Sequence, residues 1–269
     1  MRKGVLMDPT DVLDNPWDAA AAAYGQHIAR REQANMEQDP ILSRMLELLG
    51  DLSGRDVLDA GCGEGFLARV LASHSARVTG IDLSARLIAM ARKKDPHHAI
   101  AYYVGNLSRP LPAFARHFDR IGSHLALNDV ADHRGFAATL ASLARPDARV
   151  VLAFNNPYSS VVREHVTDYF ANGALGMYGG LAREGIRAHY YHRTLEEYLD
   201  AFLSVGFQLA ALADVTDQGG LPWLLPAHFR FPRFMILAFY APGEQLGTSL
   251  SAVGEPKAST GGPGHEDQG

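Results

Sequence analysis

The chain has 269 residues, of which 47% are hydrophobic and 20% charged, as in an ordinary globular protein. Its formal net charge of −5 disfavours a nucleic-acid partner, because such binding is dominated by Lys and Arg on phosphates. The single cysteine, Cys62, excludes an intramolecular disulfide and fits a reducing compartment, so a cytoplasmic location is expected. No stretch approaches the ~20 apolar residues of a membrane span, and residues 1–16 lack the apolar run of a secretory signal, so no membrane partner is expected.

The first half of the chain predicts alternating elements. Residues 1–16 are expected to be flexible, and two helices are expected between Trp17 and Gly50, the second at Pro40–Leu49 with an apolar face. From Arg55 onward, short apolar strands alternate with helical stretches, which indicates βαβ units and a parallel sheet. Strands are predicted at Asp56–Ala60, Arg77–Asp82, Ile100–Val104, Phe118–Leu125 and Arg149–Phe154, and helices at Phe66–Ser75, Ala85–Lys94 and Arg134–Ala144.

The regular alternation ends after the fifth strand. Residues 155–193 form a longer connection than compact domains usually contain, which predicts either internal helices or a functional lid. We expect a helix over Ser159–Ala171 and a flexible stretch over Ala174–Gly180, where small residues gather.

Regular elements resume at Thr194, which has capping-box spacing with Glu197 and predicts a helix running to Val205. The last two strands are expected at Phe207–Ala213 and Phe234–Tyr240. Residues 241–269 are rich in Gly, Ser and Pro and have almost no large apolar side chains. This tail is predicted to be disordered, because it cannot bury enough surface to offset its ordering entropy. The folded domain is therefore expected at residues 17–240.

A glycine-dense turn follows the first predicted strand, in the run Val57–Gly65. Glycines at such a turn allow a ligand to approach the backbone closely. The second strand ends in Asp82, about twenty residues downstream, where a doubly wound fold offers a carboxylate to ribose hydroxyls. Phe66 stands where a dinucleotide fingerprint has its third glycine, and no Lys-Ser/Thr pair follows the loop. The pattern favours a nucleoside ligand other than a dinucleotide or a triphosphate.

The run Val57–Phe66, followed by Val78–Ser84, resembles the class I S-adenosylmethionine-dependent methyltransferase family. The likeness extends more loosely from Trp17 to Tyr240, and within the family it is greatest to small-molecule enzymes of the ubiquinone-biosynthesis and natural-product type. The resemblance implies a doubly wound, seven-stranded Rossmann-like sheet with its last strand antiparallel. It also implies a helical N-terminal cover and a lid insertion at about residues 155–193.

The resemblance also implies which residues hold the cofactor, S-adenosylmethionine. They are Tyr24, Gly61, Gly63, Asp82, Leu83, Asn106, Leu107 and His124. Asp82 would accept from both ribose hydroxyls, and Tyr24 would close over the methionine carboxylate. Asn106 stands where the family usually has an aspartate for the adenine amino group, and its amide oxygen can still accept. Asp59 is interpreted as a brace of the glycine loop.

Methyl transfer depends mainly on alignment and exclusion of water, so a general base is optional. The candidates are His124, at the end of strand four, and His165, in the predicted lid helix. His189, near the end of the lid, is considered with His165, and a solvent-exposed or locally bonded histidine is the alternative for both. His192 is interpreted as structural at the helix entry. Cys62 is interpreted as a packing residue.

An apolar or aromatic substrate is expected to lie against aromatic side chains, namely Tyr158, Tyr190, Tyr191 and Trp223, for which core packing under the lid is an equal alternative. Asp129, Asp132 and His133 resemble a fragment of a metal site, but Asp and His clusters in loops are usually solvent-exposed, and the sequence does not identify the further acids that the metal-dependent branch of the family uses, so no metal is expected.

The predicted function is methyl transfer to O, N or C of a small, apolar or aromatic metabolite, in small-molecule metabolism such as natural-product biosynthesis. One alternative is a protein that binds the cofactor without methylating, as a cyclase or a sensor. A second alternative is a tRNA or protein methyltransferase. The sequence leaves a homo-oligomer open.

Overall fold

The computed structural model describes residues 15–33, 39–159, 162, 166–176, 186, 189–215 and 232–243. His165, Trp223 and the tail beyond Gly243 lie outside the described residues, and so does the side chain of His189. The α-helices of the described parts are α1 (Pro16–Gln33), α2 (Pro40–Leu49), α3 (Phe66–Ser73), α4 (Ala85–Lys94), α5 (His133–Leu143) and α8 (Leu195–Leu203). Within these described parts, no helix is both long and apolar enough to span a bilayer.

Seven strands form one sheet with the order β3-β2-β1-β4-β5-β9-β8. They are β1 (Asp56–Ala60), β2 (Arg77–Asp82), β3 (Ala101–Val104), β4 (Phe118–His124), β5 (Ala144–Asn155), β8 (Gln208–Val215) and β9 (Phe234–Tyr240). The first five are parallel, and β9 runs antiparallel to both of its neighbours, β5 and β8. The predicted doubly wound sheet with an antiparallel last strand is confirmed.

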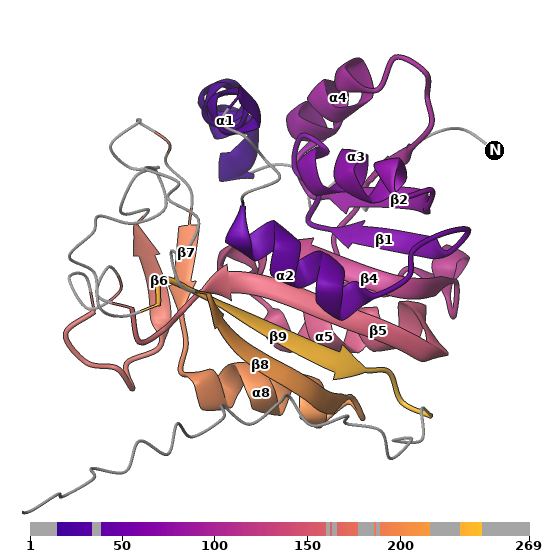
Figure 1. Ribbon diagram of the computed structural model, residues 1–269. Helices are drawn as coiled ribbons and strands as arrows, with labels where there is room; N and C mark the ends of the chain where they lie inside the picture. The colour runs from indigo at the N-terminus through magenta and orange to yellow at the C-terminus, as the bar shows by residue number, and fades with distance from the viewer. Residues whose placement is uncertain are drawn as a thin grey trace, which may run out of the picture.

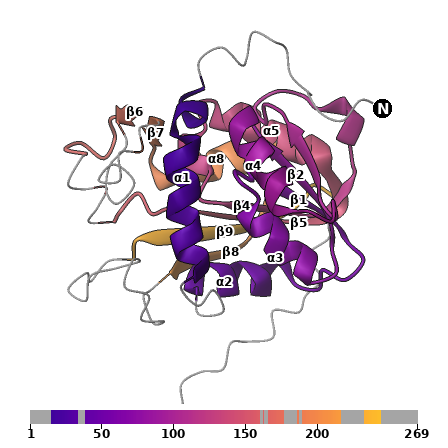
Figure 2. The ribbon, with the colours of Figure 1, turned by 90° about the horizontal axis from the view of Figure 1, so that it is seen from above.

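Helices cover both faces of the sheet, because its central strands are apolar on both sides. The helices α1 to α4 lie on one face and α5 and α8 on the other (Figures 1 and 2). Val57 of β1 belongs to the core under α2 and α3, whereas its neighbour Leu58 belongs to the core under α5 and α8. Adjacent strand residues therefore pack into opposite cores, as the two-residue period of a strand requires.

The predicted helix over Ser159–Ala171 is wrong for the described residues 166–171, which form turns and bends. The Asp168 carboxylate accepts from the Phe170 N–H (3.0 Å), and this local side-chain bond competes with a helical backbone. Ala174–Gly176, expected to be flexible, belongs to β6 (Gly173–Gly176), which pairs antiparallel with β7 (His189–His192). This hairpin lies beside the ends of the sheet strands (Figure 1).

Helix α8 begins as the sequence predicts. Thr194 Oγ1 accepts from the Glu197 N–H (3.2 Å), and the Glu197 carboxylate accepts from the Thr194 N–H (2.9 Å). The reciprocal pair is a capping box, and it fixes the point at which the chain leaves β7 and enters α8. The helix ends at Leu203, two residues before the predicted end.

Candidate active site

The glycine loop after β1 requires backbone conformations that other residues rarely adopt. Gly61, Gly63 and Gly65 have φ values of +74°, +54° and +84°. A Cβ added to Gly61 would lie 2.5 Å from the Ala126 Cβ, so the loop after β4 packs directly against the glycine loop. The N–H groups of Gly61 and Cys62 both donate to the Ile81 carbonyl (2.9 and 3.1 Å) and tie the loop to β2.

Asp82, at the end of β2, holds the same loop through its side chain. One carboxylate oxygen accepts from the Gly63 N–H (2.8 Å) and the other from the Ser84 N–H (2.8 Å). Burial raises the pKa of Asp82, while the two N–H donors act to lower it. Each oxygen accepts one hydrogen bond from the chain and retains capacity for a second, so the carboxylate is preorganised to receive two hydroxyl groups.

The loop after β3 lies next to Asp82, because the Gly105 N–H donates to the Asp82 carbonyl (2.9 Å). Asn106 follows, and its side-chain oxygen accepts from the Ser108 N–H (2.9 Å), which fixes the orientation of the amide. Leu83 is half-buried, but Leu107 is buried in the core under α5 and α8. The structure therefore places Leu83, Asn106 and Asp82 together and gives Leu107 a packing role.

Helix α1 lies over the glycine loop. A Cβ added to Gly63 would lie 3.5 Å from a ring carbon of Tyr24, so this tyrosine stands directly against the loop. The Asp18 carboxylate, in the first turn of α1, accepts from the Ser84 hydroxyl and from the Arg86 N–H (3.1 Å). Helix α1 is thereby fixed to the residues that follow Asp82.

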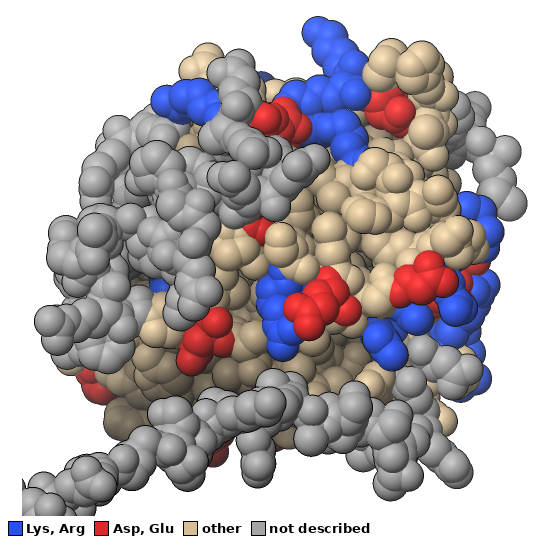
Figure 3. All heavy atoms as spheres, viewed as in Figure 1, with Lys and Arg blue, Asp and Glu red and all other residues tan. Residues whose placement is uncertain are grey.

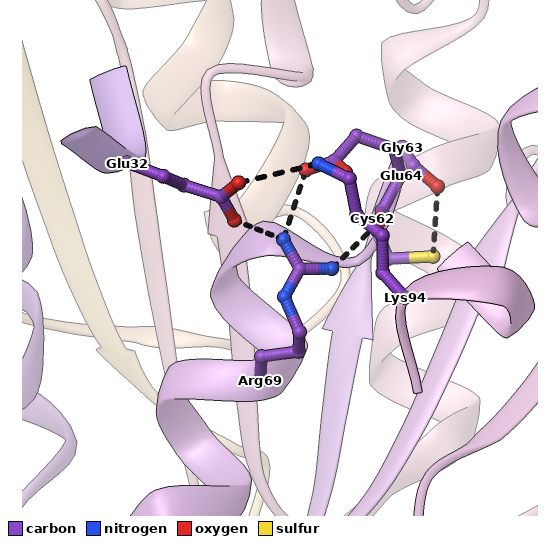
Figure 4. Close-up of polar contacts among 6 residues, drawn as sticks. All are labelled: Glu32, Cys62, Gly63, Glu64, Arg69 and Lys94. Atoms are coloured by element: carbon purple, nitrogen blue, oxygen red, sulfur yellow. Dashed lines mark hydrogen bonds and ion pairs between the residues drawn. The ribbon is translucent and has the colours of Figure 1, made fainter. Parts of the chain in front are cut away.

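A second link joins α1 to the glycine loop (Figure 4). The side chain of Glu64 is buried within the loop and pairs with Arg69 of α3 (3.2 Å) and with Lys94 of α4. Both cations also pair with Glu32, near the end of α1. Burial acts to raise the pKa of Glu32, but its pairs with Arg69 and Lys94 outweigh this effect and lower it. Two acidic and two basic side chains therefore connect α1, α3, α4 and the glycine loop.

Asp59 of β1 is fully buried, and both carboxylate oxygens are closed off from solvent. Burial raises the pKa of Asp59 to about 8; the Ala68 N–H acts to lower it and the negative charge of Asp82 to raise it further. The group is thus mainly protonated at neutral pH and lies under the loop. The thiol of Cys62 is also buried, and burial raises its pKa well above the usual value, so a thiolate nucleophile is suppressed.

The loop after β4 carries His124 at its start and the short 3-10 turn η4 (Leu127–Asp129). The His124 ring lies 5.6 Å from the Phe66 ring, and its Nε2 atom is closed off from solvent. His124 therefore lies at the end of β4, as expected, but its ring packs against Phe66 of α3.

Asn128 fixes this loop through three elements. Its amide nitrogen donates to the hydroxyls of Tyr198 (2.9 Å) and Tyr190 (3.3 Å), and its oxygen accepts from the Asn155 N–H (2.8 Å). Arg193 donates to the carbonyls at positions 130 and 131 (both 2.7 Å). The sequence interpretation did not identify Asn128 or Arg193, because their partners lie more than 25 residues away in the chain.

The three described tyrosines proposed as substrate contacts do not form one wall. Tyr190 is buried and bound to Asn128, whereas Tyr191, the next residue of β7, lies under the Arg193 guanidinium (5.2 Å). Tyr158 is 47% exposed and stacks on Tyr169, with ring centroids 5.3 Å apart. Tyr190 contacts the loop after β4 through its hydrogen bond with Asn128.

The residues that resembled a metal fragment have other surroundings. The Asp132 carboxylate caps α5 by accepting from the Gly135 N–H (2.8 Å). Burial, together with the charge of Arg193, lowers the pKa of His133 to about 4. Over the described ranges, no three His, Cys, Asp or Glu side chains gather closely enough to hold a metal ion.

Known proteins resemble this chain in sequence and in fold. Residues 58–152 match the model of the methyltransferase domain family. A ubiquinone biosynthesis O-methyltransferase of Coxiella burnetii is 30% identical over 172 residues, which cover 61% of this chain and 69% of that one. A demethylmenaquinone methyltransferase of Tropheryma whipplei is 34% identical over 113 residues, or 41% of this chain and 46% of that one. The chain spans about half the length of the first curated relatives that it matches.

Solved structures agree on the fold. An S-adenosylmethionine-dependent methyltransferase from Mesorhizobium loti is 24% identical and superposes with a TM-score of 0.59 over 77% of this chain and 99% of that one. A TehB-like S-adenosylmethionine-dependent methyltransferase from Corynebacterium glutamicum is 20% identical, with a TM-score of 0.57 over 83% and 98%. With the glycine loop, the acid of β2 and the strand order already described, these likenesses show that the chain belongs to the class I S-adenosylmethionine-dependent methyltransferase family.

Proposed function

We propose that the chain binds S-adenosylmethionine and transfers its methyl group to an oxygen, nitrogen or carbon atom of a small apolar or aromatic metabolite. One observation carries the proposal: Asp82 holds the Gly63 and Ser84 N–H groups while each of its oxygens retains capacity for a hydroxyl. A ribose with two neighbouring hydroxyls matches this carboxylate. The thioether chain of the cofactor is expected to lie along the backbone of the glycine loop, where Gly61 and Gly63 carry no side chains.

The residues proposed to hold the cofactor divide among its parts. Asp82 accepts from the ribose hydroxyls, Leu83 lies against the adenine, and the Asn106 amide receives the adenine amino group. Gly61 and Gly63 face the methionine part, and Tyr24 covers it from α1. Leu107 supports this surface from the core, and His124 lies beside the sulfur from β4.

When bound, the cofactor supplies a methyl carbon already activated by positive sulfur. The chain then has to align the acceptor at about 3 Å and exclude water. Helix α1 contributes to both tasks, because Asp18 bonds to Ser84 after β2, and Glu32 pairs with Arg69 of α3, which also pairs with Glu64 of the glycine loop. Tyr24, which lies between Asp18 and Glu32 in α1, packs against Gly63 of the glycine loop. His124 and His165 remain candidates for removing a proton from a hydroxyl acceptor, and Tyr158, Tyr190, Tyr191 and Trp223 for contacting the substrate.

A small acceptor is favoured over a polynucleotide. Lys and Arg are interspersed with Asp and Glu over the described part of the face in Figure 3, and the formal net charge of the chain is −5. A tRNA substrate would favour a continuous basic surface. The relatives cited above are named for ubiquinone biosynthesis and for demethylmenaquinone, which are small-molecule rather than nucleic-acid names, and this supports a small-molecule acceptor here.

The direct test is formation of S-adenosylhomocysteine. The chain is incubated with S-adenosylmethionine and a panel of phenols, catechols, aliphatic alcohols, amines and carboxylic acids, and the product is quantified. Turnover that depends on one class and is lost in Asp82→Ala supports the proposal. Tight binding of S-adenosylhomocysteine with no turnover across the panel favours a cyclase or sensor instead. Failure to bind the nucleoside at all overturns the cofactor assignment.

A further inference from the structure

Asp129 ends the turn η4, three residues after the Ala126 side chain that packs against Gly61. It lies near enough to Asp82 for the negative charge of Asp82 to raise its pKa, in addition to the larger effect of burial. This acid therefore stands on the β4 side of the glycine loop, opposite the acid that the preceding section assigns to the ribose. Nothing in the proposed cofactor contacts uses it.

The Asp129 carboxylate has no partner in the described part of the chain: none of those residues donates a hydrogen bond to it or forms an ion pair with it. It differs from Asp59, whose oxygens are fully closed off, because Asp129 is only half-buried. A carboxylate is suited to receive a ligand when burial raises its pKa, when no cation pairs with it and when it remains partly exposed to solvent.

The groups around Asp129 come from three sides. Asp82 approaches from β2, and Tyr198 of α8 is close enough for the Asp129 charge to contribute to a pKa of about 12 for the phenol, for which burial is the main cause. Tyr190 of β7 and Asn155 of β5 contact the preceding residue, Asn128, rather than Asp129 itself. Asp82 is an acid and Tyr198 is a neutral phenol, so neither neutralises Asp129. Arg193 is a cation in the same region, but its guanidinium donates to the carbonyls of Val130 and Ala131, and the described residues show no ion pair between it and Asp129.

The position of Asp129 is fixed from both sides in sequence. Asn128, the preceding residue, is bound to two tyrosines and to Asn155. The two following residues are held through their carbonyls by Arg193. A half-buried acid held this firmly on a short turn meets the geometric requirement for a group that acts on a reacting atom.

We propose that Asp129 is the general base of the reaction and that the acceptor is a hydroxyl group. The inference rests on the proposed methyl transfer. The acceptor O–H bond breaks and its proton passes to an Asp129 oxygen, an oxygen lone pair forms the bond to the methyl carbon, and the carbon–sulfur bond breaks with its electrons returning to sulfur. The proton then leaves to solvent through the open side of the carboxylate. The positive sulfur of the bound cofactor, if it lies near Asp129, would favour the ionised carboxylate and so keep the base active in the loaded enzyme.

Binding experiments test the placement without a substrate. Sinefungin, an analogue of S-adenosylhomocysteine, carries an amine where the reacting methyl group would lie. We expect Asp129→Asn to weaken sinefungin binding about tenfold or more by calorimetry and to change S-adenosylhomocysteine binding less than about threefold, because only the amine meets the carboxylate. The matched control is Asp132→Asn, which removes one charge from an exposed position of the same loop and retains a capping oxygen. It should leave both affinities unchanged.

A pH–rate profile tests the chemistry with the best hydroxyl substrate of the panel. The wild type should lose activity as the pH falls through the pKa of Asp129 in the loaded enzyme, because the base becomes protonated. Asp129→Asn should be slower by about 10² to 10⁴ and lose this acid limb, whereas Asp129→Glu should retain it. An unchanged sinefungin affinity in Asp129→Asn, or an acid limb that persists there and disappears in His124→Gln, would overturn the assignment. Failure of the wild type to bind S-adenosylhomocysteine would instead reject the proposed function itself.

Discussion

The two ends of the chain build their parts of the site differently. The cofactor half consists of β1 to β3 and the loops that follow them, and those loops are short and tied to β2 through the Gly61 and Gly105 N–H groups and the Asp82 carboxylate. The lid half consists of the β6–β7 hairpin and α8, which reach the loop after β4 through side chains of Asn128 and Arg193. The contacts of the cofactor half join neighbouring strands and their loops, whereas those of the lid half join residues far apart in the chain.

The largest expected effect lies in the cofactor half. Asp82→Ala should lower the affinity for S-adenosylhomocysteine by about 100-fold or more, because it removes two charge-assisted hydrogen bonds to ribose and the anchor of the Gly63 N–H. Calorimetry measures the change. The control from the other half is Asp200→Ala on α8, which removes an exposed ion pair with Arg134 of α5 and should not change this affinity. Equal losses in the two variants would remove the distinction between the halves.

A second comparison uses glycines. Gly61→Ala should lower the free energy of unfolding by about 2 to 4 kcal/mol, because φ is +74° and the new Cβ would lie 2.5 Å from the Ala126 Cβ. Gly173→Ala in β6 meets nothing within 4 Å and should change stability by less than about 0.5 kcal/mol. Urea unfolding of both variants gives the two values. A stable Gly61→Ala protein would show that the loop is less rigid than its contacts indicate.

Asp59→Asn tests the buried acid under the glycine loop. Its carboxyl has a pKa of about 8 in the fold, above its value in the unfolded chain, so the wild type loses stability as the pH rises from about 4 to about 8. The amide does not titrate. Relative to wild type, the variant should therefore gain about 1.4 kcal/mol per pH unit across this window and no more above it. Parallel stability curves from urea unfolding at pH 5, 6, 7 and 8 would contradict the neutral acid.

The smallest effect is expected in the lid half. Thr194→Ala removes the hydroxyl that caps α8 and should cost about 1 kcal/mol. Thr194→Ser retains the hydroxyl and should cost much less. The measurement is urea unfolding. A loss above about 3 kcal/mol would mean that the lid half depends on single residues as strongly as the cofactor half does.

The sequence predicted the cofactor half closely because its signals are local. The bounds of β1 and β2 follow from apolar runs that end at the glycine turn and at Asp82. Helix α4 begins directly after Ser84, whose side chain caps it. The capping box at Thr194 was equally readable. These features depend on residues within a few positions of one another, and their backbone geometry follows from those residues alone.

The lid half was predicted less well because its structure depends on distant partners. The helix expected over Ser159–Ala171 is replaced in its described part by turns, and β6 forms only by pairing with β7. Asn128 looks like an ordinary loop residue until its bonds to Tyr190 and Tyr198 are seen. The sequence places Asp129 only in a possible fragment of a metal site. Whether a cation pairs with its carboxylate depends on the fold and cannot be predicted from neighbouring residues.

The most direct test of the central claim is a crystal structure of the chain with S-adenosylhomocysteine. The account predicts both ribose hydroxyls on the Asp82 carboxylate, the thioether chain along Gly61 and Gly63 under Tyr24, and the sulfur facing the loop after β4. A nucleoside bound elsewhere, or a ribose that makes no contact with Asp82, would contradict it.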